Sequence, residues 1–216
     1  MNPRELLQDA RLLLVTDPRP DLAARVAAAA RGGVDVVQLR DKRASREELI
    51  PLAVELKEIC ESSGALFTVN DDAELALLSG AHGVHLGQED EQIVSAREML
   101  GPGVVIGRSV SSVEEAREAV REGADYLGVG TVYATPTKPE EAAAGPVLLR
   151  EISGAAVPVP WFAIGGVTLE TAREVAEAGA PGFAVVRALL DAEDPAAAAR
   201  ELRSFLADAP HGRVRA

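Results

Sequence analysis

The feature of this sequence that most restricts its fold is a regular alternation of two kinds of segment. Short apolar runs rich in β-branched residues alternate with Ala/Glu/Arg-rich amphipathic runs, which is the pattern of parallel strands covered by helices. Eight strands are expected, at 11–16, 35–40, 66–70, 83–86, 104–108, 126–130, 161–165 and 183–187. Each unit then has about 27 residues, enough for one strand, one helix and two short loops. The sequence predicts a single α/β domain over 1–207, a (β/α)8 TIM barrel, with a solvated tail over 208–216.

The alternative fold is a doubly wound open sheet, because it is built from the same units. The first expected strand is not followed by the Gly-x-Gly-x-x-Gly pattern that is typical of dinucleotide-binding sheets. The number of units also favours closure into a barrel. Gly33, Gly80, Gly123 and Gly179 stand ahead of the second, fourth, sixth and eighth strands, so a four-fold pattern runs through the eight-fold one.

Capping residues predict where several helices begin. Ser45 and Ser112 each stand three residues before a Glu, as in a capping box, and Thr168 and Asp194 are expected to open two further helices. The longest connection runs over 131–146 and has the composition of a mobile loop, so it is a candidate lid over the site.

Charge and composition exclude several classes of function. The chain has 34 Asp+Glu against 22 Lys+Arg, a formal charge of −12, and 3% aromatic residues, which together exclude nucleic acid as a partner. No apolar run approaches the length of a membrane span, and the first residues lack the order of a signal peptide. The single cysteine, Cys60, is expected to be structural. We expect a cytoplasmic protein, and the sequence leaves a homo-oligomeric assembly open.

Basic residues follow several of the predicted strands. In a barrel the carboxyl ends of the strands meet at one rim, where active sites lie. The cations expected there are Arg40, Lys42, Arg108, Lys138 and Arg187. Their placement in an acidic chain favours a polyanionic small molecule, because Arg and Lys bind phosphate oxygens. For any one of them, the alternative is a solvated loop residue.

Two carboxylates end consecutive strands at the same rim. Asp71 follows the third strand and Asp90 follows the fourth, with Glu89 left open as a second candidate beside Asp90. Such a pair suits Mg²⁺ on a diphosphate, because Mg²⁺ takes one or two protein carboxylates and completes its shell with phosphate oxygens and water. The alternative is general acid/base catalysis by the pair. His85, on the fourth strand, is expected to be an interior, hydrogen-bonded histidine.

A second anion site is expected where the seventh and eighth strands end. Gly165 and Gly166 lie there, and Val186 and Arg187 end the next strand, at the place where barrels commonly bind a phosphate through backbone N–H groups. The rim therefore has room for two anionic groups, which implies two phosphorylated small-molecule substrates.

Several of these segments together resemble the thiamine phosphate synthase family. The ordered set covers the chain from about residue 11 to residue 195. The segments are Gln38-Leu-Arg-Asp-Lys42, Val69-Asn70-Asp71, Gly83-Val-His-Leu-Gly-Gln-Glu-Asp90, Gly128-Val-Gly130, Thr135-Pro-Thr137-Lys138 and Ile164-Gly165-Gly166.

The resemblance implies a transferase of thiamine biosynthesis that joins hydroxymethylpyrimidine diphosphate to thiazole phosphate, plain or carboxylated, and releases pyrophosphate. It implies Mg²⁺ as cofactor, with Asp71 and Asp90 as ligands. The implied contacts to the pyrimidine diphosphate are Gln38, Arg40, Lys42, Asn70, Ser109 and Lys138, among which Arg40, Lys42, Ser109 and Lys138 form the catalytic set. The implied contacts to the thiazole phosphate are Thr135, Thr137, Gly166 and the backbone of Val186 and Arg187. Gly165, beside Gly166, is also expected to bind substrate.

Two other functions remain as alternatives. A thiazole tautomerase, a related barrel, resembles the segment Gly107-Arg108-Ser109-Val110, but those relatives carry a His where this chain has Ser111. That difference, and the retained pair Asp71 and Asp90, favour the synthase. A barrel that binds phosphorylated ligands without catalysis would leave the carboxylate pair idle.

Overall fold

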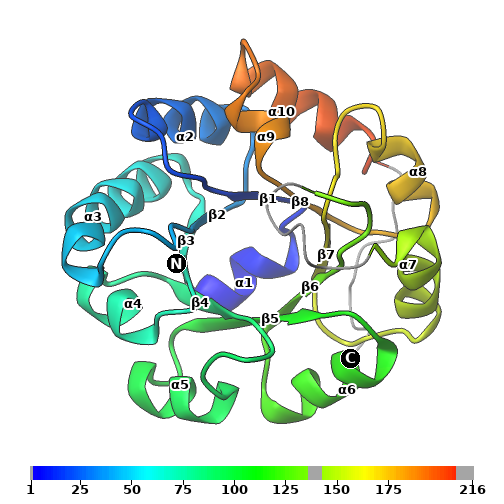
Figure 1. The fold of residues 1–216 in the computed structure, drawn as a ribbon, viewed down its shortest axis with the longest axis horizontal. Helices are drawn as coiled ribbons and strands as arrows, with labels where there is room; N and C mark the ends of the chain where they lie inside the picture. The colour runs from blue at the N-terminus through cyan, green and yellow to red at the C-terminus, as the bar shows by residue number, and fades with distance from the viewer. Residues whose placement is uncertain (1, 136–142, 208–216) are drawn as a thin grey trace.

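A computed structural model of the chain describes residues 2–135 and 143–207 and shows a closed barrel of eight parallel strands (Figure 1). Each strand pairs with the next along the chain, and β8 closes the ring on β1, where Leu12 lies opposite Phe183. The strands are β1 (Leu12–Val15), β2 (Val36–Leu39), β3 (Leu66–Asn70), β4 (Gly83–Leu86), β5 (Val105–Val110), β6 (Tyr126–Val129), β7 (Trp161–Ile164) and β8 (Phe183–Val185). The predicted (β/α)8 barrel is confirmed.

Helices surround this barrel, and one lies across its end (Figure 1). They are α1 (Pro3–Gln8), α2 (Leu22–Arg31), α3 (Arg46–Ser63), α4 (Ala73–Ser79), α5 (Ile93–Leu100), α6 (Val113–Glu122), α7 (Gly145–Gly154), α8 (Ala172–Glu177), α9 (Arg187–Leu190) and α10 (Pro195–Ser204). Within residues 2–135 and 143–207, none of them is both long and apolar enough to span a bilayer.

Side chains alternate between the two faces of the barrel wall along each strand, as the two-residue period of a strand requires. The inward positions Leu13, Val36, Leu66, Tyr126 and Phe162 form one buried cluster inside the barrel. The positions between them pack against the surrounding helices in a second, larger cluster. This alternation decides which residues near the strand ends can reach the central cavity.

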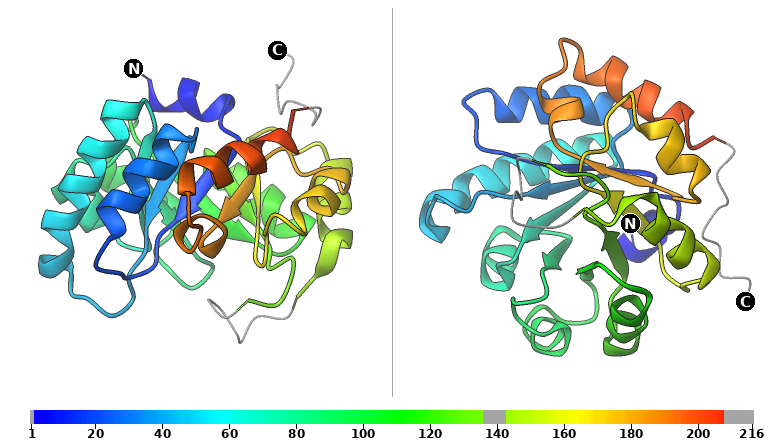
Figure 2. Two further views of the ribbon diagram at one scale, coloured as in Figure 1. Left: turned by 90° about the horizontal axis from the view of Figure 1, so that it is seen from above. Right: turned by 45° about the vertical axis from the view of Figure 1, so that its right-hand side comes forward.

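The short helix α1, which the sequence analysis did not predict, closes the amino-terminal end of the barrel. Figure 2 (left) shows it at one end, with the start of α3 at the other. Its Leu7 is 1% exposed and belongs to the interior cluster. Arg4 fixes the helix to the barrel, because its Nε lies 2.6 Å from Oδ1 of Asp125 and its Nη1 donates to the carbonyl of Pro102. The interior of the barrel at its amino-terminal end is therefore filled by a buried apolar cluster.

The four-fold glycine pattern has a structural counterpart at this same end. Asp35, two residues after Gly33, accepts hydrogen bonds from the backbone N–H groups of Arg11 and Leu12 at 2.7 and 2.9 Å. Asp125, two residues after Gly123, likewise accepts one from Ile106 at 2.8 Å. After Gly80 the corresponding residue is His82, whose Nδ1 accepts from Phe67 N–H. In three repeats, the side chain before an even strand thus satisfies the start of the preceding strand.

The predicted helix caps are confirmed in part. Ser45 forms the full capping box with Glu48, and Asp194 accepts from the N–H groups of Ala196 and Ala197. Ser112 caps α6, but the carboxylate of Glu115 binds the N–H of Ser111 and not that of Ser112. The prediction that Thr168 caps a helix is wrong. Residues 168–171 form a turn, with the Thr168 N–H donating to Oγ1 of Thr171, and α8 begins after it.

Burial should make Cys60 unreactive in the folded protein. Its thiol lies in the core between α3 and the barrel, where burial raises its pKa to about 12. Because the thiolate is the reacting species, we expect alkylation by iodoacetamide at neutral pH at least about 100-fold slower than for the urea-unfolded protein. Equal labelling rates in the folded and unfolded states would contradict this packing.

Candidate active site

A cavity of about 1190 Å³ opens at the carboxyl ends of the strands, and all eight strands contribute to its lining. It brings together the described members of the predicted site. These are Gln38, Arg40, Lys42, Asn70, Asp71, Asp90, Ser109, Thr135, Gly165, Gly166, Val186 and Arg187. The two remaining predicted residues, Thr137 and Lys138, lie outside the described residues, as does the middle of the candidate lid. These described residues, which follow or lie in different strands, therefore share one rim.

Inward-facing polar side chains of four neighbouring strands form the floor of the cavity. Nε2 of Gln38 donates to Oδ1 of Asn70 at 2.8 Å, and Nε2 of His85 lies 3.0 Å from Oγ of Ser109. Gln38 and His85 are 3% and 6% exposed. These hydrogen bonds fix the orientation of side chains that have few conformations left open by packing. The floor can therefore present fixed donors and acceptors to a flat heterocycle.

The His85 ring depends on a glycine in the next strand. It packs against Tyr126 with ring centroids 5.3 Å apart. A Cβ atom at Gly107 would lie 2.4 Å from Nδ1 of His85 and 2.2 Å from Cζ of Tyr126. No side chain larger than hydrogen fits there without displacing both rings, so Gly107 makes room for the histidine.

The carboxylates of Asp71 and Asp90 lie together at one side of the cavity. Burial, followed by the hydrogen bond and charge interaction with Asp90, raises the pKa of Asp71 to about 6. Burial also acts upward on Asp90, but hydrogen bonds with Asp71 and with the Gly87 N–H, which lies 2.7 Å from Oδ2, hold its pKa below the usual range. Nζ of Lys42 lies 3.4 Å from Oδ2 of Asp71. The two carboxyl groups therefore compete for one proton.

This pair fits a magnesium ion. Two facing carboxylates repel each other when both are charged, and a divalent cation between them would relieve that repulsion. Among residues 2–135 and 143–207, no group of three or more His, Cys, Asp or Glu side chains is arranged to hold a metal. A site with two protein ligands suits Mg²⁺, which keeps positions for phosphate oxygens and water, better than it suits a metal held by protein alone.

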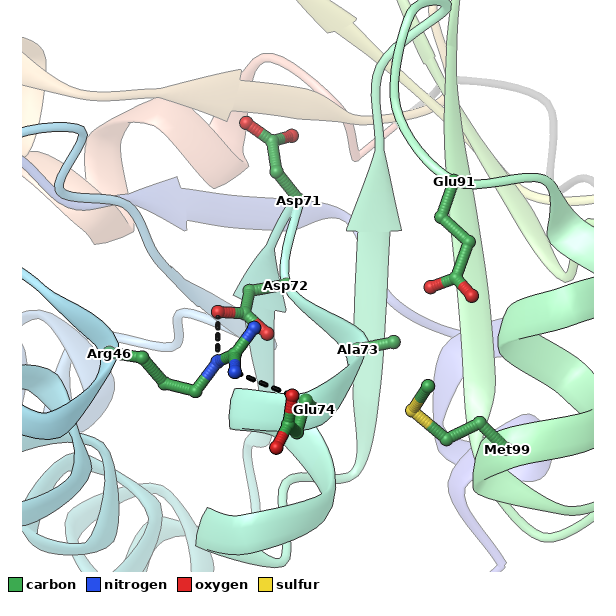
Figure 3. A pocket seen from close by; sticks show the side chains of 7 residues that line it. All are labelled: Arg46, Asp71, Asp72, Ala73, Glu74, Glu91 and Met99. Carbon is green, nitrogen blue, oxygen red and sulfur yellow. Dashed lines mark hydrogen bonds and ion pairs between the residues drawn. The ribbon is translucent and has the colours of Figure 1, made fainter.

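The neighbouring Asp72 has a different role, as Figure 3 shows. A smaller recess of about 330 Å³ lies beside the end of β3, and both Asp71 and Asp72 line it. In Figure 3 the Asp71 side chain points away from Arg46, Asp72 and Glu74, which lie together. Asp72 caps α4 and lies 2.7 Å from Nε of Arg46, which also pairs with Glu74. Asp71 itself has φ +64°, and its N–H donates to the carbonyl of His85 at 2.8 Å. This backbone turn directs two successive carboxylates to opposite sides.

The expectation that Arg108 belongs to the substrate-binding cations is wrong. It lies between the inward positions Gly107 and Ser109, so its own side chain faces outward from the barrel, and it does not line the described part of the cavity. Its Nη1 and Nη2 donate to the carbonyls of Glu91 and Gln88 at 3.2 and 3.3 Å. Arg40, Lys42 and Arg187 do line the cavity.

The Gly165-Gly166 turn follows β7, and β7 lies across the barrel from β3 and β4, whose ends carry the carboxylate pair. Both glycines have positive φ angles, +100° and +64°, a backbone conformation that residues with a side chain rarely adopt. A Cβ at Gly166 would lie 2.7 Å from Cβ of Tyr133. Val186 and Arg187 line the cavity beside this turn, but β8 ends at Val185 and Arg187 begins α9, so the predicted eighth strand was two residues too long. Backbone that lines the cavity is thus available at this side.

Sequence reasoning left other cavity-lining residues without a role. They are His85, Gln88, Thr131 and Thr168, among others. The interior placement and hydrogen bonding of His85 were predicted and are confirmed. Gln88 and Thr168 carry no periodic signal, because they lie in loops whose course depends on tertiary contacts.

Comparisons with known proteins agree with this geometry. Residues 12–189 match the family model described as thiamine monophosphate synthase. The chain is 48% identical over 204 residues to a thiamine-phosphate synthase of Nostoc sp., covering 94% of this chain and 57% of that protein. The chain thus spans somewhat more than half the length of several relatives it matches.

Other relatives are matched over nearly their whole length. A thiamine-phosphate synthase of Halorhodospira halophila is 48% identical over 196 residues, covering 90% of this chain and 93% of that protein. Among solved structures, a thiamine phosphate pyrophosphorylase from Pyrococcus furiosus superposes with a TM-score of 0.83 at 38% identity, over 93% of this chain and 97% of that one. The chain therefore belongs to the thiamine monophosphate synthase family.

Proposed function

We propose that this chain is a magnesium-dependent thiamine phosphate synthase. It would transfer the pyrimidinylmethyl group of hydroxymethylpyrimidine diphosphate to the ring nitrogen of a thiazole phosphate and release pyrophosphate. The observation that carries the proposal is that a carboxylate pair, several cations and a glycine backbone turn line one cavity. Membership of the family supports the same activity.

The reaction requires charge neutralisation and alignment more than a protein nucleophile. The bond between the methylene carbon and the diphosphate oxygen breaks, and its electron pair leaves with pyrophosphate. The aminopyrimidine spreads the positive charge that remains, and the lone pair of the thiazole nitrogen forms the new carbon–nitrogen bond. An enzyme accelerates such a step by placing fixed charges at the leaving group and by holding the two reactants in line.

The cavity offers residues for the diphosphate half of this reaction. Asp71 and Asp90 would hold Mg²⁺, which when bound neutralises charge on the diphosphate. Arg40 and Lys42 line the same side and would bind its oxygens, Lys42 from its place 3.4 Å from Asp71. The hydrogen-bonded floor of Gln38 and Asn70 would orient the pyrimidine, since amide groups match the donors and acceptors of an aminopyrimidine.

The other half of the cavity would bind the thiazole phosphate. Gly166 and the backbone at 186–187 face it, and Thr135 adds a hydroxyl. Backbone N–H groups bind a phosphate closely where no side chain intervenes. By resemblance, Thr137 would contact this phosphate and Lys138 the diphosphate.

The direct test supplies both phosphorylated substrates, with and without Mg²⁺, and measures thiamine phosphate and pyrophosphate. We expect both products in equal amounts, only with the metal. Formation of neither product would contradict the proposal. Isomerisation of the thiazole phosphate alone would favour the tautomerase, and binding of the substrates without turnover would favour a barrel that binds phosphorylated ligands without catalysis.

A methyl group at Gly166 should weaken binding of one substrate selectively. We expect Gly166→Ala to raise KM for the thiazole phosphate about 10-fold or more, because the new Cβ crowds Tyr133 and moves the backbone that approaches the phosphate. KM for the pyrimidine diphosphate should change much less. Steady-state kinetics with each substrate varied measures the difference. Gly154→Ala, where a Cβ meets nothing within 4 Å, is the control; equal changes in both KM values would contradict the assignment.

A further inference from the structure

Arg108 is a buried cation that faces away from the substrates. It lies on β5 between two residues that face the barrel interior, so its own side chain points outward, yet it is only 8% exposed. Its guanidinium meets the loop that follows β4, where it donates to the carbonyls of Gln88 and Glu91. Burying a guanidinium is costly unless its N–H groups are satisfied, so this contact has a structural consequence for the loop.

The loop over 87–91 carries Asp90 and is held from both faces. On the cavity side it folds back on itself: the Asp90 N–H donates to the Gly87 carbonyl at 3.3 Å, and the Gly87 N–H donates to Oδ2 of Asp90 at 2.7 Å. On the outer side, Arg108 binds carbonyls on either side of Asp90. In addition, Nε2 of Gln88 donates to the carbonyl of Ser109 at 2.5 Å.

We propose that Arg108 is a positioning residue, which holds the 87–91 loop so that the carboxylate of Asp90 faces that of Asp71. Arg108 does not line the described part of the cavity, so it is placed to act through the loop. The inference rests on the proposed use of Asp71 and Asp90 as magnesium ligands. The guanidinium would orient a metal ligand without binding the metal itself. Loss of a group that orients a metal ligand typically weakens metal binding 10- to 100-fold.

The shape of the side chain matters as well as its charge. A guanidinium has N–H groups in a fixed planar fork, so it reaches two carbonyls three residues apart at once. A lysine keeps the positive charge, but its donors all lie on one nitrogen, so it lacks the two separate Nη positions that meet the carbonyls of Glu91 and Gln88. Arg108→Lys therefore separates the geometry of the fork from the charge.

A matched control lies at the other end of the barrel. Arg97 on α5 also donates to backbone carbonyls, those of Gly101 and Val104, and pairs with Asp125 at 2.5 Å. Arg97→Lys should perturb the protein to a similar degree without touching the 87–91 loop. Comparing the two variants removes effects that any loss of a partly buried arginine would cause.

The first measurement is metal binding without turnover. Mn²⁺ binding in the presence of inorganic pyrophosphate is followed by electron paramagnetic resonance for the wild type and both variants. We expect Arg108→Lys to weaken Mn²⁺ binding about 10-fold or more, and Arg97→Lys to leave it within about two-fold. The second measurement is hydrogen exchange by mass spectrometry, in which amides over 87–91 should exchange faster in Arg108→Lys alone.

Wild-type affinity and exchange in Arg108→Lys would overturn the inference, and so would equal losses in both variants. Absence of Mn²⁺ binding in the wild type would also overturn it, because the positioned ligand pair would then hold no metal. Failure of the proposed function is recognised separately, by the absence of thiamine phosphate in the substrate assay, whatever the outcome of the exchange comparison.

Discussion

Replacement of either Asp71 or Asp90 by asparagine is expected to reduce thiamine phosphate formation by at least about 100-fold at saturating substrates. Asparagine keeps the size of the side chain and one oxygen but removes the negative charge. The remaining carboxylate then holds a divalent cation weakly, and the charge on the departing pyrophosphate is left without its counterion. Release of pyrophosphate, followed with a coupled phosphate assay over a range of Mg²⁺ concentrations, measures the loss.

The adjacent Asp72 provides the control for this prediction. Asp72→Asn makes the same chemical change one residue away, but that side chain does not line the cavity that Asp71 and Asp90 share, and asparagine is as good a helix cap as aspartate. We expect activity within about three-fold of the wild type, because only the partly exposed pair with Arg46 is lost. Near-normal activity in Asp71→Asn, or equal losses in all three variants, would contradict the magnesium assignment.

Among the substitutions proposed here, Leu7→Ala should lower the stability of the fold the most. The side chain lies in the interior cluster at the closed end of the barrel, and Leu7→Ala leaves a cavity that the surrounding strands cannot fill. We expect the free energy of unfolding to fall by about 2 to 5 kcal/mol, measured by urea denaturation.

An exposed leucine calibrates this measurement. Leu77 on α4 is 53% exposed, so Leu77→Ala removes the same atoms without opening an interior cavity. A change within about 0.5 kcal/mol is expected there. If both substitutions had effects of the same size, α1 would not be an integral part of the barrel.

The barrel itself could be predicted from the sequence because its signal repeats. Two of the expected strands, 66–70 and 83–86, coincide with β3 and β4 residue for residue. The boundaries of the others differ by one or two residues, since strand ends depend on pairing with neighbours. The helix α1 was missed because six residues carry little periodicity, and its position depends on the interior it closes.

The site was predicted where a residue type and its place in the strand agree. Asp71, Asp90 and Gln38 follow or lie in strands whose register brings them to the cavity, and all three line it. Arg108 has a suitable charge at a strand end, but the two-residue period turns it outward, and a count of inward positions from Gly107 would have excluded it. Thr168 has a capping side chain, but the following residues form a turn first, which local sequence does not reveal.

The closure of the barrel by α1 has a kinetic consequence. With Leu7 and its neighbours filling one end, the described cavity is a blind pouch, and everything that enters or leaves crosses the rim that carries Arg40, Lys42 and Arg187. In the proposed reaction, a pyrimidine seated on the floor at Gln38 would have to bind before the thiazole phosphate that covers it, and it would leave joined to that thiazole. Because the cavity has one opening, its shape predicts an ordered binding sequence, in which the substrate that lies deeper binds first.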